Sequence, residues 1–201
     1  MSQYVKFTYK CTRADIVPFA ALGELNACRR KLVDQHLLGV CPNGVGFGNV
    51  SLCDCPTTSF YLTGSATGGL AELTPADCVR IVAYDFARNW LSYEGIAIPS
   101  SESLTHAAIY ESDSITSAVI HCHNSALWAM LLDRVTTTSK AVTYGTPELA
   151  SEIIRLFQIS DVRSEKIFVM AGHRDGIVTF GKNLDEAFQV LMRMKRNIAL
   201  H

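Results

Sequence analysis

Short β-forming segments alternate with helical segments along this chain, and this alternation limits the folds that it can adopt. Apolar stretches that are short, alternating or rich in β-branched residues predict strands over residues 60–62, 79–83, 90–93, 119–123, 167–170 and 177–180. Helical spacing of apolar positions and helix-start signals predict helices over residues 16–38, 101–110, 125–132, 147–157 and 184–199. Because strands interleave with helices, we expect an α/β fold in which helices cover a sheet, an α/β/α sandwich.

The ends of the first helix and the loops that follow it carry local signals. Asp15 is suited to cap that helix, and Gly39 is suited to end it. Two stretches rich in small residues, 44–51 and 63–69, are expected to be loops, and the sequence over 74–77 predicts a capped turn.

Composition excludes several classes of protein. The 201 residues contain no Ser-, Gly- or Pro-rich linker and no internal repeat, so we expect one domain over residues 1–201. Eighteen Lys and Arg against 19 Asp and Glu give a net charge of -1, without the basic surface that nucleic-acid binding needs. No apolar run approaches the roughly 20 residues of a membrane span. The first residues lack a secretion signal, so a cytoplasmic protein is expected.

The seven cysteines are expected to be reduced thiols. Their number is odd, no C-x-x-C pair occurs, and a disulfide framework suits secreted chains. Cys41, Cys53 and Cys55 are an alternative metal-binding trio, although a single C-x-C pair matches structural zinc spacing poorly.

His121 and His123 are the strongest local signal for chemistry. Residues i and i+2 of a strand project from the same face, so both imidazoles can reach one point while Cys122 faces the core. Two converging neutral imidazoles are half of a typical zinc site, and the alternative is a solvated pair at a strand end.

Glu102 and His173 are candidates for the remaining ligands. His173 follows an apolar strand between glycines, which leaves it free to point into a cleft. Three histidines and a carboxylate complete a four-ligand site in which the carboxylate can yield its place to a substrate. The alternative for Glu102 is a favourable charge at a helix N-terminus. His106, four residues further along the same helix, is expected to support the site or pack rather than act as a fifth ligand.

These residues belong to a series of motifs, and with them the chain resembles the class II aldolase/adducin family. In order, the motifs are Gly48-Asn49-Val50-Ser51, Ser65–Gly68, Leu73-Thr74-Pro75-Ala76-Asp77, Pro99-Ser100-Ser101-Glu102 with His106 and Tyr110, His121-Cys122-His123, Tyr144-Gly145-Thr146-Pro147-Glu148-Leu149-Ala150, and His173. The resemblance implies a central, largely antiparallel sheet and a homotetramer.

The resemblance also implies a chemistry. His121, His123 and His173 would hold a divalent metal, with zinc the usual occupant and manganese or cobalt as alternatives. Glu102 would alternate between metal ligand and general acid/base. The expected reaction is retro-aldol cleavage of a small hydroxy-ketone, phosphorylated or not, through a metal-stabilised enediolate. The positions that match the family's phosphate-binding loops are Gly48, Asn49, Thr67, Gly68, Ser100 and Ser101, with ordinary turn chemistry as the alternative for Thr67 and Gly68.

The chain also departs from the family pattern. The segment after the histidine pair is short, and residues 131–142 lack the tyrosine that is thought to protonate the leaving group. We expect a divergent member with this short segment and no C-terminal tail. Tyr110 and Tyr144 are the remaining candidates for the proton donor. Arg174 and Asp175 follow His173 where a glycine is common, either as a local ion pair or with Arg174 facing a substrate anion.

Two other functions stay open. Family members that share the metal ligands include epimerases, a dehydratase and decarboxylases, so the ligands alone do not select the reaction. A non-enzymatic interaction module of the adducin type is the second alternative, and the presence of all four ligand residues argues against it.

Overall fold

An eight-stranded sheet forms the centre of the computed structural model, which describes residues 6–14, 16 and 19–199, with side chains through residue 196. Its strand order is β1-β7-β6-β5-β4-β8-β10-β9. The strands are β1 (Thr8–Thr12), β4 (Asn49–Cys53), β5 (Phe60–Thr63), β6 (Cys78–Asp85), β7 (Trp90–Gly95), β8 (Ala118–His123), β9 (Ile167–Val169) and β10 (Gly176–Gly181). Every neighbouring pair is antiparallel except β1 and β7, so the sheet is largely antiparallel, as predicted.

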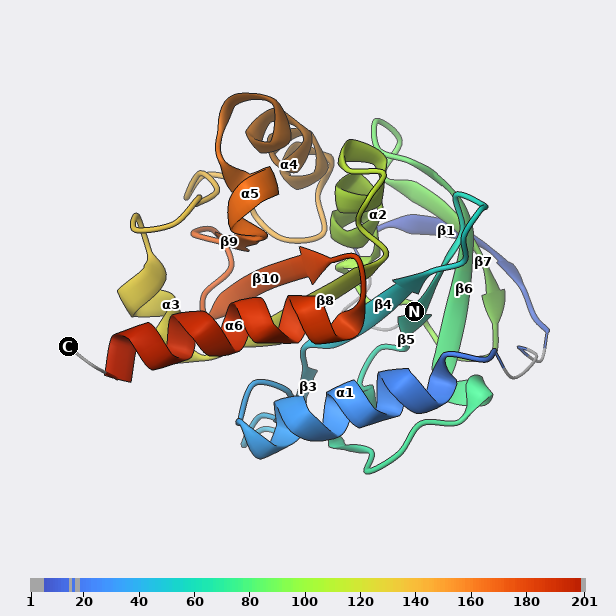
Figure 1. The fold of residues 1–201 in the computed structure, drawn as a ribbon. Coiled ribbons are helices and arrows are strands. Elements are labelled where there is room, and N and C mark those ends of the chain that lie inside the picture. Colours follow the sequence, from blue (N-terminus) through green and yellow to red (C-terminus); the bar gives the residue numbers. More distant parts are fainter. Residues whose placement is uncertain (1–5, 15, 17–18, 200–201) are drawn as a thin grey trace.

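Helices cover both faces of this sheet and complete the three layers (Figure 1). One face packs against α1 (Leu22–Asp34), α3 (Ser125–Leu131) and α6 (Leu184–Ala199). The other packs against α2 (Ser103–Ser112), α4 (Pro147–Ile159) and α5 (Val162–Glu165). Two short 3-10 helices, Thr67–Gly69 and Pro75–Asp77, and a small hairpin of β2 (Gly39–Val40) and β3 (Gly46–Phe47) lie in the connections. No helix in the described part of the chain combines the length and the hydrophobicity that a membrane crossing requires.

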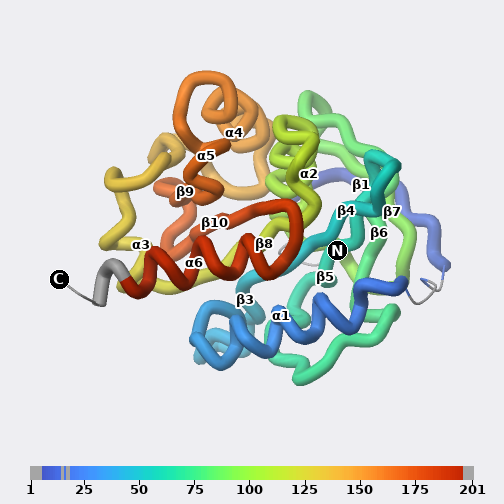
Figure 2. Tube along the Cα trace, in the orientation of Figure 1, coloured from blue at the N-terminus to red at the C-terminus, as the bar shows by residue number. Residues whose placement is uncertain are grey.

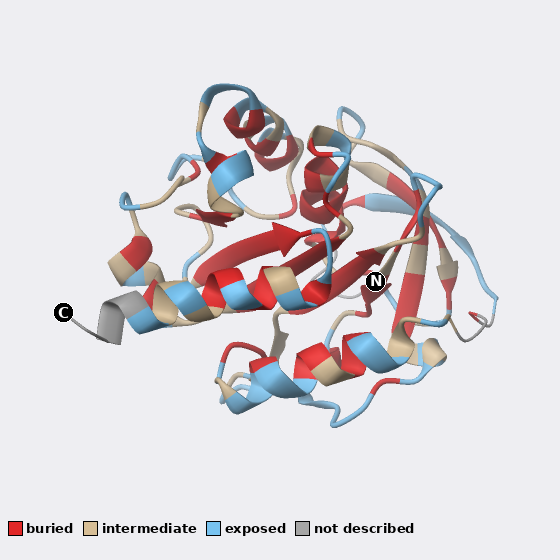
Figure 3. Ribbon diagram, in the orientation of Figure 1, coloured by how far each residue is buried: buried red, intermediate tan, exposed pale blue. Residues whose placement is uncertain are grey.

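The alternation of side chains along β8 divides the core. Ala118, Ile120 and Cys122 are buried toward α1 and α6, whereas Val119 is buried toward α2 and α4. Figure 3 shows the central strands buried along most of their length. After β8 the chain leaves the sheet, forms α3, α4 and α5, re-enters the sheet as the edge strand β9, and then lies beside β8 as β10 (Figure 2). This return pairs residues that are about fifty positions apart in the sequence, and the pairing positions the site described below.

Most predicted elements are present, and two predicted regions on the N-terminal side differ from the structure. The first helix spans Leu22–Asp34 rather than residues 16–38, because His36 takes a left-handed backbone (φ 57°) and Gly39 pairs with Phe47 in a hairpin. Asp15, the predicted cap, lies outside the described residues. Residues 49–53, expected partly as a loop, form β4, because β5 and β8 supply hydrogen-bond partners on both of its edges.

The cysteine prediction is wrong for one pair. Cys53 and Cys55 form a disulfide, since the chain turns at the end of β4 and brings their Cα atoms to 5.3 Å. Cys11, Cys28, Cys41, Cys78 and Cys122 are free thiols. The disulfide also excludes the metal-binding trio that included these two residues.

Candidate metal centre

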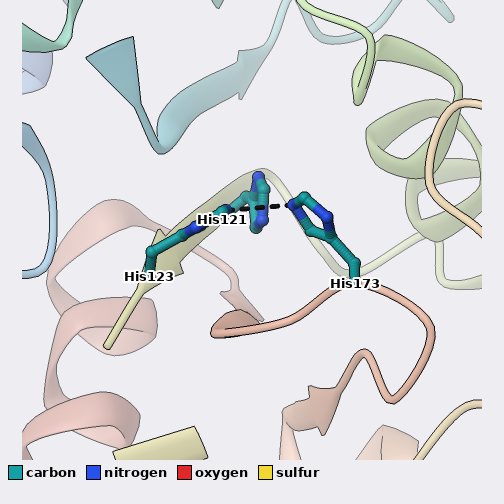
Figure 4. A group of neighbouring side chains, drawn as sticks. All are labelled: His121, His123 and His173. Atoms are coloured by element: carbon teal, nitrogen blue, oxygen red, sulfur yellow. Dashed lines mark hydrogen bonds between the residues drawn. The ribbon is translucent and has the colours of Figure 1, made fainter. Parts of the chain in front are cut away.

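Strand β8 carries two of the three histidines that meet at one point. His121 and His123 lie on the face opposite Cys122, as the period of a strand requires (Figure 4). Neighbouring strands hold both positions, because Asn49 of β4 is paired with His121 and Gly176 of β10 is paired with His123. His121 is also paired with Val178 of β10, so its backbone is fixed by strands on both edges, whereas His123 is paired with β10.

His173 reaches the same point from the tight turn between β9 and β10. The backbone N–H of His173 donates to the carbonyl of Met170, and that of Gly176 donates to the carbonyl of His173. Both flanking glycines are needed, because a Cβ on Gly172 would lie 1.8 Å from the Val142 carbonyl oxygen and one on Gly176 would lie 2.6 Å from the His173 ring. The turn that carries His173 therefore requires glycine at positions 172 and 176.

The three imidazoles have the geometry of a metal-binding group. One ligand nitrogen from each of His121, His123 and His173 lies within 4.8 Å of the others. The Nε2 atoms of His123 and His173 are 3.0 Å apart, and two nitrogens bound to a tetrahedral zinc ion are separated by about 3.3 Å. Nε2 of His121 is buried and has no hydrogen-bond partner among the described residues, a donor atom that a metal ion would satisfy.

Electrostatics keep these imidazoles neutral, which is the form that binds a metal. Burial lowers the pKa of all three, to about 3 for His173, and each neighbouring histidine disfavours a second charge on His121 and His173. For His123 the carboxylate of Asp175 acts in the opposite direction and favours the protonated ring. A divalent ion can therefore bind with little competition from protons.

Glu102 lies in the same pocket but outside the group of three. Its side-chain Oε2 accepts a hydrogen bond from Thr105 Oγ1 (2.7 Å), whereas Oε1 is buried without a partner among the described residues. Burial raises the pKa of this carboxyl to about 7, against the opposing effects of Thr105 and the Lys6 ammonium. Glu102 occupies the N-cap position of α2 without accepting a hydrogen bond from the helix backbone, so its side chain is not used as a cap.

A buried hydrogen-bond chain lies behind His121. His106 donates from Nε2 to Asn49 Oδ1 (2.6 Å), and its Nδ1 accepts from Ser51 Oγ (2.6 Å), which is in turn bonded to the Tyr110 hydroxyl (2.7 Å). Asn49 Nδ2 donates to Ser100 Oγ (2.9 Å) and lies 3.5 Å from Nδ1 of His121. His106 thus contacts the site through Asn49.

The histidines and Glu102 line a pocket of about 480 Å³. Of the residues predicted to bind phosphate, the structure places Gly48, Asn49, Ser100 and Ser101 in its wall. Thr67 and Gly68 are not among the described lining residues. Thr67 Oγ1 donates to the Gly64 carbonyl, and Gly68 packs so closely against Gly39 that a Cβ would lie 2.2 Å from its carbonyl oxygen, which is turn chemistry.

The structure also places one of the two candidate proton donors in the pocket. Tyr144 lines it, with its ring centroid 4.3 Å from that of His173. Lys6, to which the sequence assigned no role, contacts this ring, with Nζ 3.3 Å from the Tyr144 ring centroid. Tyr144 belongs to a recognisable motif, whereas nothing in the sequence near Lys6 indicates a site. Arg174 is largely exposed and 3.8 Å from Asp175, so the local ion pair is what the structure shows.

Comparisons with known proteins agree with this geometry. The family described as Class II Aldolase and Adducin N-terminal domain matches residues 42–201, well over half of the chain. A search of curated proteins finds no match.

Solved structures share the fold at low sequence identity. An L-fuculose 1-phosphate aldolase is 23% identical, with a TM-score of 0.68, over 93% of this chain and 88% of that chain. YgbL from Escherichia coli, whose description leaves aldolase, epimerase and decarboxylase open, is 18% identical, with a TM-score of 0.66, over 90% and 87%. A sugar-phosphate aldolase from Thermotoga maritima is 14% identical, with a TM-score of 0.62, over 90% and 95%. At these identities the likeness shows the fold alone.

Proposed function

Because this chain belongs to the class II aldolase and adducin family, we propose that it is a divalent-metal-dependent lyase that cleaves a small, phosphorylated hydroxy-ketone by a retro-aldol reaction. One observation carries the proposal. Three neutral imidazoles with ligand nitrogens within 4.8 Å of one another share a pocket with a buried carboxyl whose pKa is about 7. We treat residues 1–201 as one domain, which the shared eight-stranded sheet supports, and propose a homotetramer by family resemblance.

The metal would be held by His121, His123 and His173, with Glu102 as the exchangeable ligand. Three imidazole nitrogens and one carboxylate oxygen are ligands that favour zinc, and manganese or cobalt would be substitutes. When bound, the ion would polarise the ketone carbonyl and stabilise negative charge that develops on its oxygen.

Glu102 is the residue proposed to move a proton at carbon. A general acid/base works best when its pKa lies near the working pH, and burial brings this carboxyl to about 7. Oε1 is free of protein partners among the described residues, whereas Oε2 is held by Thr105. The carboxyl is thus oriented by one oxygen and can act with the other.

The part of the pocket beside Gly48 suits an anion. Gly48 has a left-handed backbone (φ 77°), and a Cβ there would lie 3.0 Å from the His121 carbonyl oxygen, so this turn packs directly against the strand of the metal ligands. Asn49, Ser100 and Ser101 add an amide and two hydroxyls beside it. Amides and hydroxyls on a glycine-rich turn are suited to a phosphate group, which supports a phosphorylated substrate.

Metal content is the first test, because the reaction depends on it. We expect about one divalent ion per chain in the purified or zinc-reconstituted protein, and none in a His121→Ala/His123→Ala variant. The control is His36→Asn, which changes an exposed histidine and keeps a residue tolerant of its left-handed backbone (φ 57°). Protein that binds no metal under any of these conditions would leave the adducin-like interaction module as the better function.

Activity then separates the reactions that share this centre. The loaded protein is expected to cleave L-fuculose 1-phosphate or another ketose 1-phosphate and to release a ketone phosphate and an aldehyde. Isomerised, dehydrated or decarboxylated products with no aldehyde would instead support an epimerase, dehydratase or decarboxylase, a range that the description of YgbL also spans.

A further inference from the structure

The proposed reaction moves protons at two different places. Glu102 serves the carbon next to the ketone carbonyl, but the oxygen of the aldehyde fragment also needs a proton when the carbon–carbon bond forms and must lose it when the bond breaks. A second acid is therefore required in the pocket, at some distance from Glu102.

Tyr144 is the tyrosine among the described residues that line the pocket. It lies just before α4, half-buried, and its ring rests on that of His173 with the centroids 4.3 Å apart. This contact places the phenol ring beside the metal ligands. The other hydroxyls among the described lining residues belong to Ser65, Ser100 and Ser101, which are far weaker acids than a phenol.

Tyr110, the other tyrosine of the family-like motifs, has a different environment. Its hydroxyl is bonded to Ser51 Oγ at 2.7 Å, and it is not among the described residues of the pocket wall. Complete burial raises its pKa, which disfavours any loss of its proton. The structure therefore separates two tyrosines that the sequence leaves equivalent.

Lys6 contacts both the ring and the backbone of Tyr144. Its Nζ lies 3.3 Å from the ring centroid and donates a hydrogen bond to the Tyr144 carbonyl at 3.1 Å. Asn89 holds the same segment by donating to the Lys6 carbonyl at 2.8 Å. A cation over the face of an aromatic ring is attracted to it, so Lys6 holds the ring of Tyr144 in place.

From this geometry we infer that Tyr144 is a catalytic residue, the acid and base for the aldehyde oxygen, and the inference rests on the proposed retro-aldol function. In the direction of condensation, Glu102 takes a proton from carbon and the C–H electron pair forms the enediolate. The enediolate carbon bonds to the aldehyde carbon, the C=O π pair moves to oxygen, and that oxygen takes the proton of Tyr144. Water then protonates the phenolate and accepts the proton of Glu102, so atoms and charges balance, and cleavage is the reverse.

The test separates the two proton transfers. Zinc-reconstituted wild type and Tyr144→Phe are compared in two assays. One is condensation of dihydroxyacetone phosphate with lactaldehyde, the fragments of L-fuculose 1-phosphate. The other is exchange of the C–H proton of dihydroxyacetone phosphate in D₂O, followed by NMR. Tyr144→Phe should lower the condensation rate by about 10²–10⁴-fold, while the exchange rate and the zinc content stay within about threefold.

Two further tyrosine variants complete the experiment. Tyr110→Phe tests the competing donor and should lower condensation by less than about tenfold. Tyr61→Phe, which changes a ring stacked on Phe19 at 4.1 Å, is the control for the substitution itself. Glu102→Gln should abolish exchange and condensation together.

Each other outcome overturns a defined part of the argument. If Tyr144→Phe condenses as fast as wild type, or if Tyr110→Phe takes the large loss, the inference fails and the proposed function stands. If Tyr144→Phe loses exchange or zinc as well, the ring acts by packing on His173 and the donor role fails. If zinc-loaded wild type neither exchanges nor condenses these compounds nor cleaves any ketose 1-phosphate, the proposed function and the inference both fail.

Discussion

The pocket has two walls that are built in different ways. The histidine wall, His121, His123 and His173, lies on β8 and on the turn that leads into β10, the neighbouring strand. The tyrosine wall, Tyr144 and Lys6, comes from two irregular segments 138 residues apart. Sheet register positions the first wall, and a few side-chain contacts position the second. We therefore expect perturbations of the histidine wall to have large effects on zinc affinity, and loss of the Lys6 contact that supports Tyr144 to have a small effect.

Gly176→Ala should displace His173 from the histidine wall and weaken zinc binding. A Cβ at residue 176 would lie 2.6 Å from the His173 ring, so the ring must move away from the point that it shares with His121 and His123. By analogy with losses of ligand-orienting groups, we expect zinc affinity, measured by competition with a chromophoric chelator, to fall about 100-fold.

The control for this substitution lies in α1. Gly23 has no heavy atom within 4 Å of its Cβ position, so Gly23→Ala should leave zinc affinity unchanged and preserve or raise stability. Equal zinc affinities for Gly176→Ala and wild type would show that the turn tolerates the side chain and that register does not fix His173.

His106→Gln should change the pH dependence of stability, because His106 is a neutral imidazole in the buried hydrogen-bond chain behind the histidine wall. The pKa of His106 falls from 6.5 to about 3 because the ring is fully buried. Below pH 6.5 the unfolded chain therefore binds a proton that the folded protein does not, and the stability present above pH 6.5 is lost as the pH falls. From pH 8 to pH 5 this group alone lowers the free energy of unfolding by about 2 kcal/mol.

Urea unfolding at the two pH values measures this contribution, because the other histidines are common to both proteins. The difference in unfolding free energy between pH 8 and pH 5 should be about 2 kcal/mol smaller in His106→Gln than in wild type. The variant should also be less stable at pH 8 by about 1–3 kcal/mol, since the hydrogen bonds to Asn49 and Ser51 are impaired. Parallel pH profiles for the two proteins would exclude a neutral buried His106.

The sequence predicts the histidine wall well because its rules are local. Alternation along a strand is enough to place His121 and His123 on one face and Cys122 on the other, and the structure shows that arrangement. The α/β/α layers and the largely antiparallel sheet follow from element order and family resemblance. The glycines on both sides of His173 are also typical of a turn.

The contact between Lys6 and Tyr144 could not be predicted, because it joins segments that lie far apart in the sequence. Lys6 precedes β1, an edge strand whose five residues are all exposed and show no apolar alternation, and this strand was not predicted. Its parallel pairing with β7 and the Asn89 contact bring Lys6 to Tyr144. Strand β4 was predicted only in part for the same reason, because residues 49–53 form a strand through pairing with β5 and β8, which are distant in the sequence.

Asp175→Asn should weaken the histidine wall by less than Gly176→Ala does. The Asp175 carboxylate interacts electrostatically with His123, and its Oδ1 is buried without a hydrogen-bond partner among the described residues. Removal of this negative charge beside a cation site should lower zinc affinity about tenfold. The matched control is Asp133→Asn, an exposed aspartate with a similar left-handed backbone (φ 60° against 68°), which should not change zinc affinity. A similar loss in both variants would assign the effect to net charge rather than to position.

Lys6→Met should have the smallest effect, on catalysis alone. Methionine keeps an apolar side chain of similar length over the Tyr144 ring and removes the ammonium, whose contact with the ring is worth about 0.5–1 kcal/mol at an exposed site. We expect kcat for the condensation to fall about two- to fivefold, with zinc affinity unchanged, because Lys6 touches Tyr144 and not the ligands. Lys10→Met, on the exposed strand β1, is the control and should leave kcat as in wild type. A larger loss of kcat in Lys6→Met, or any loss of zinc, would mean that the N-terminal segment also holds the histidine wall in place, and the division of the pocket into two independently built walls would then be wrong.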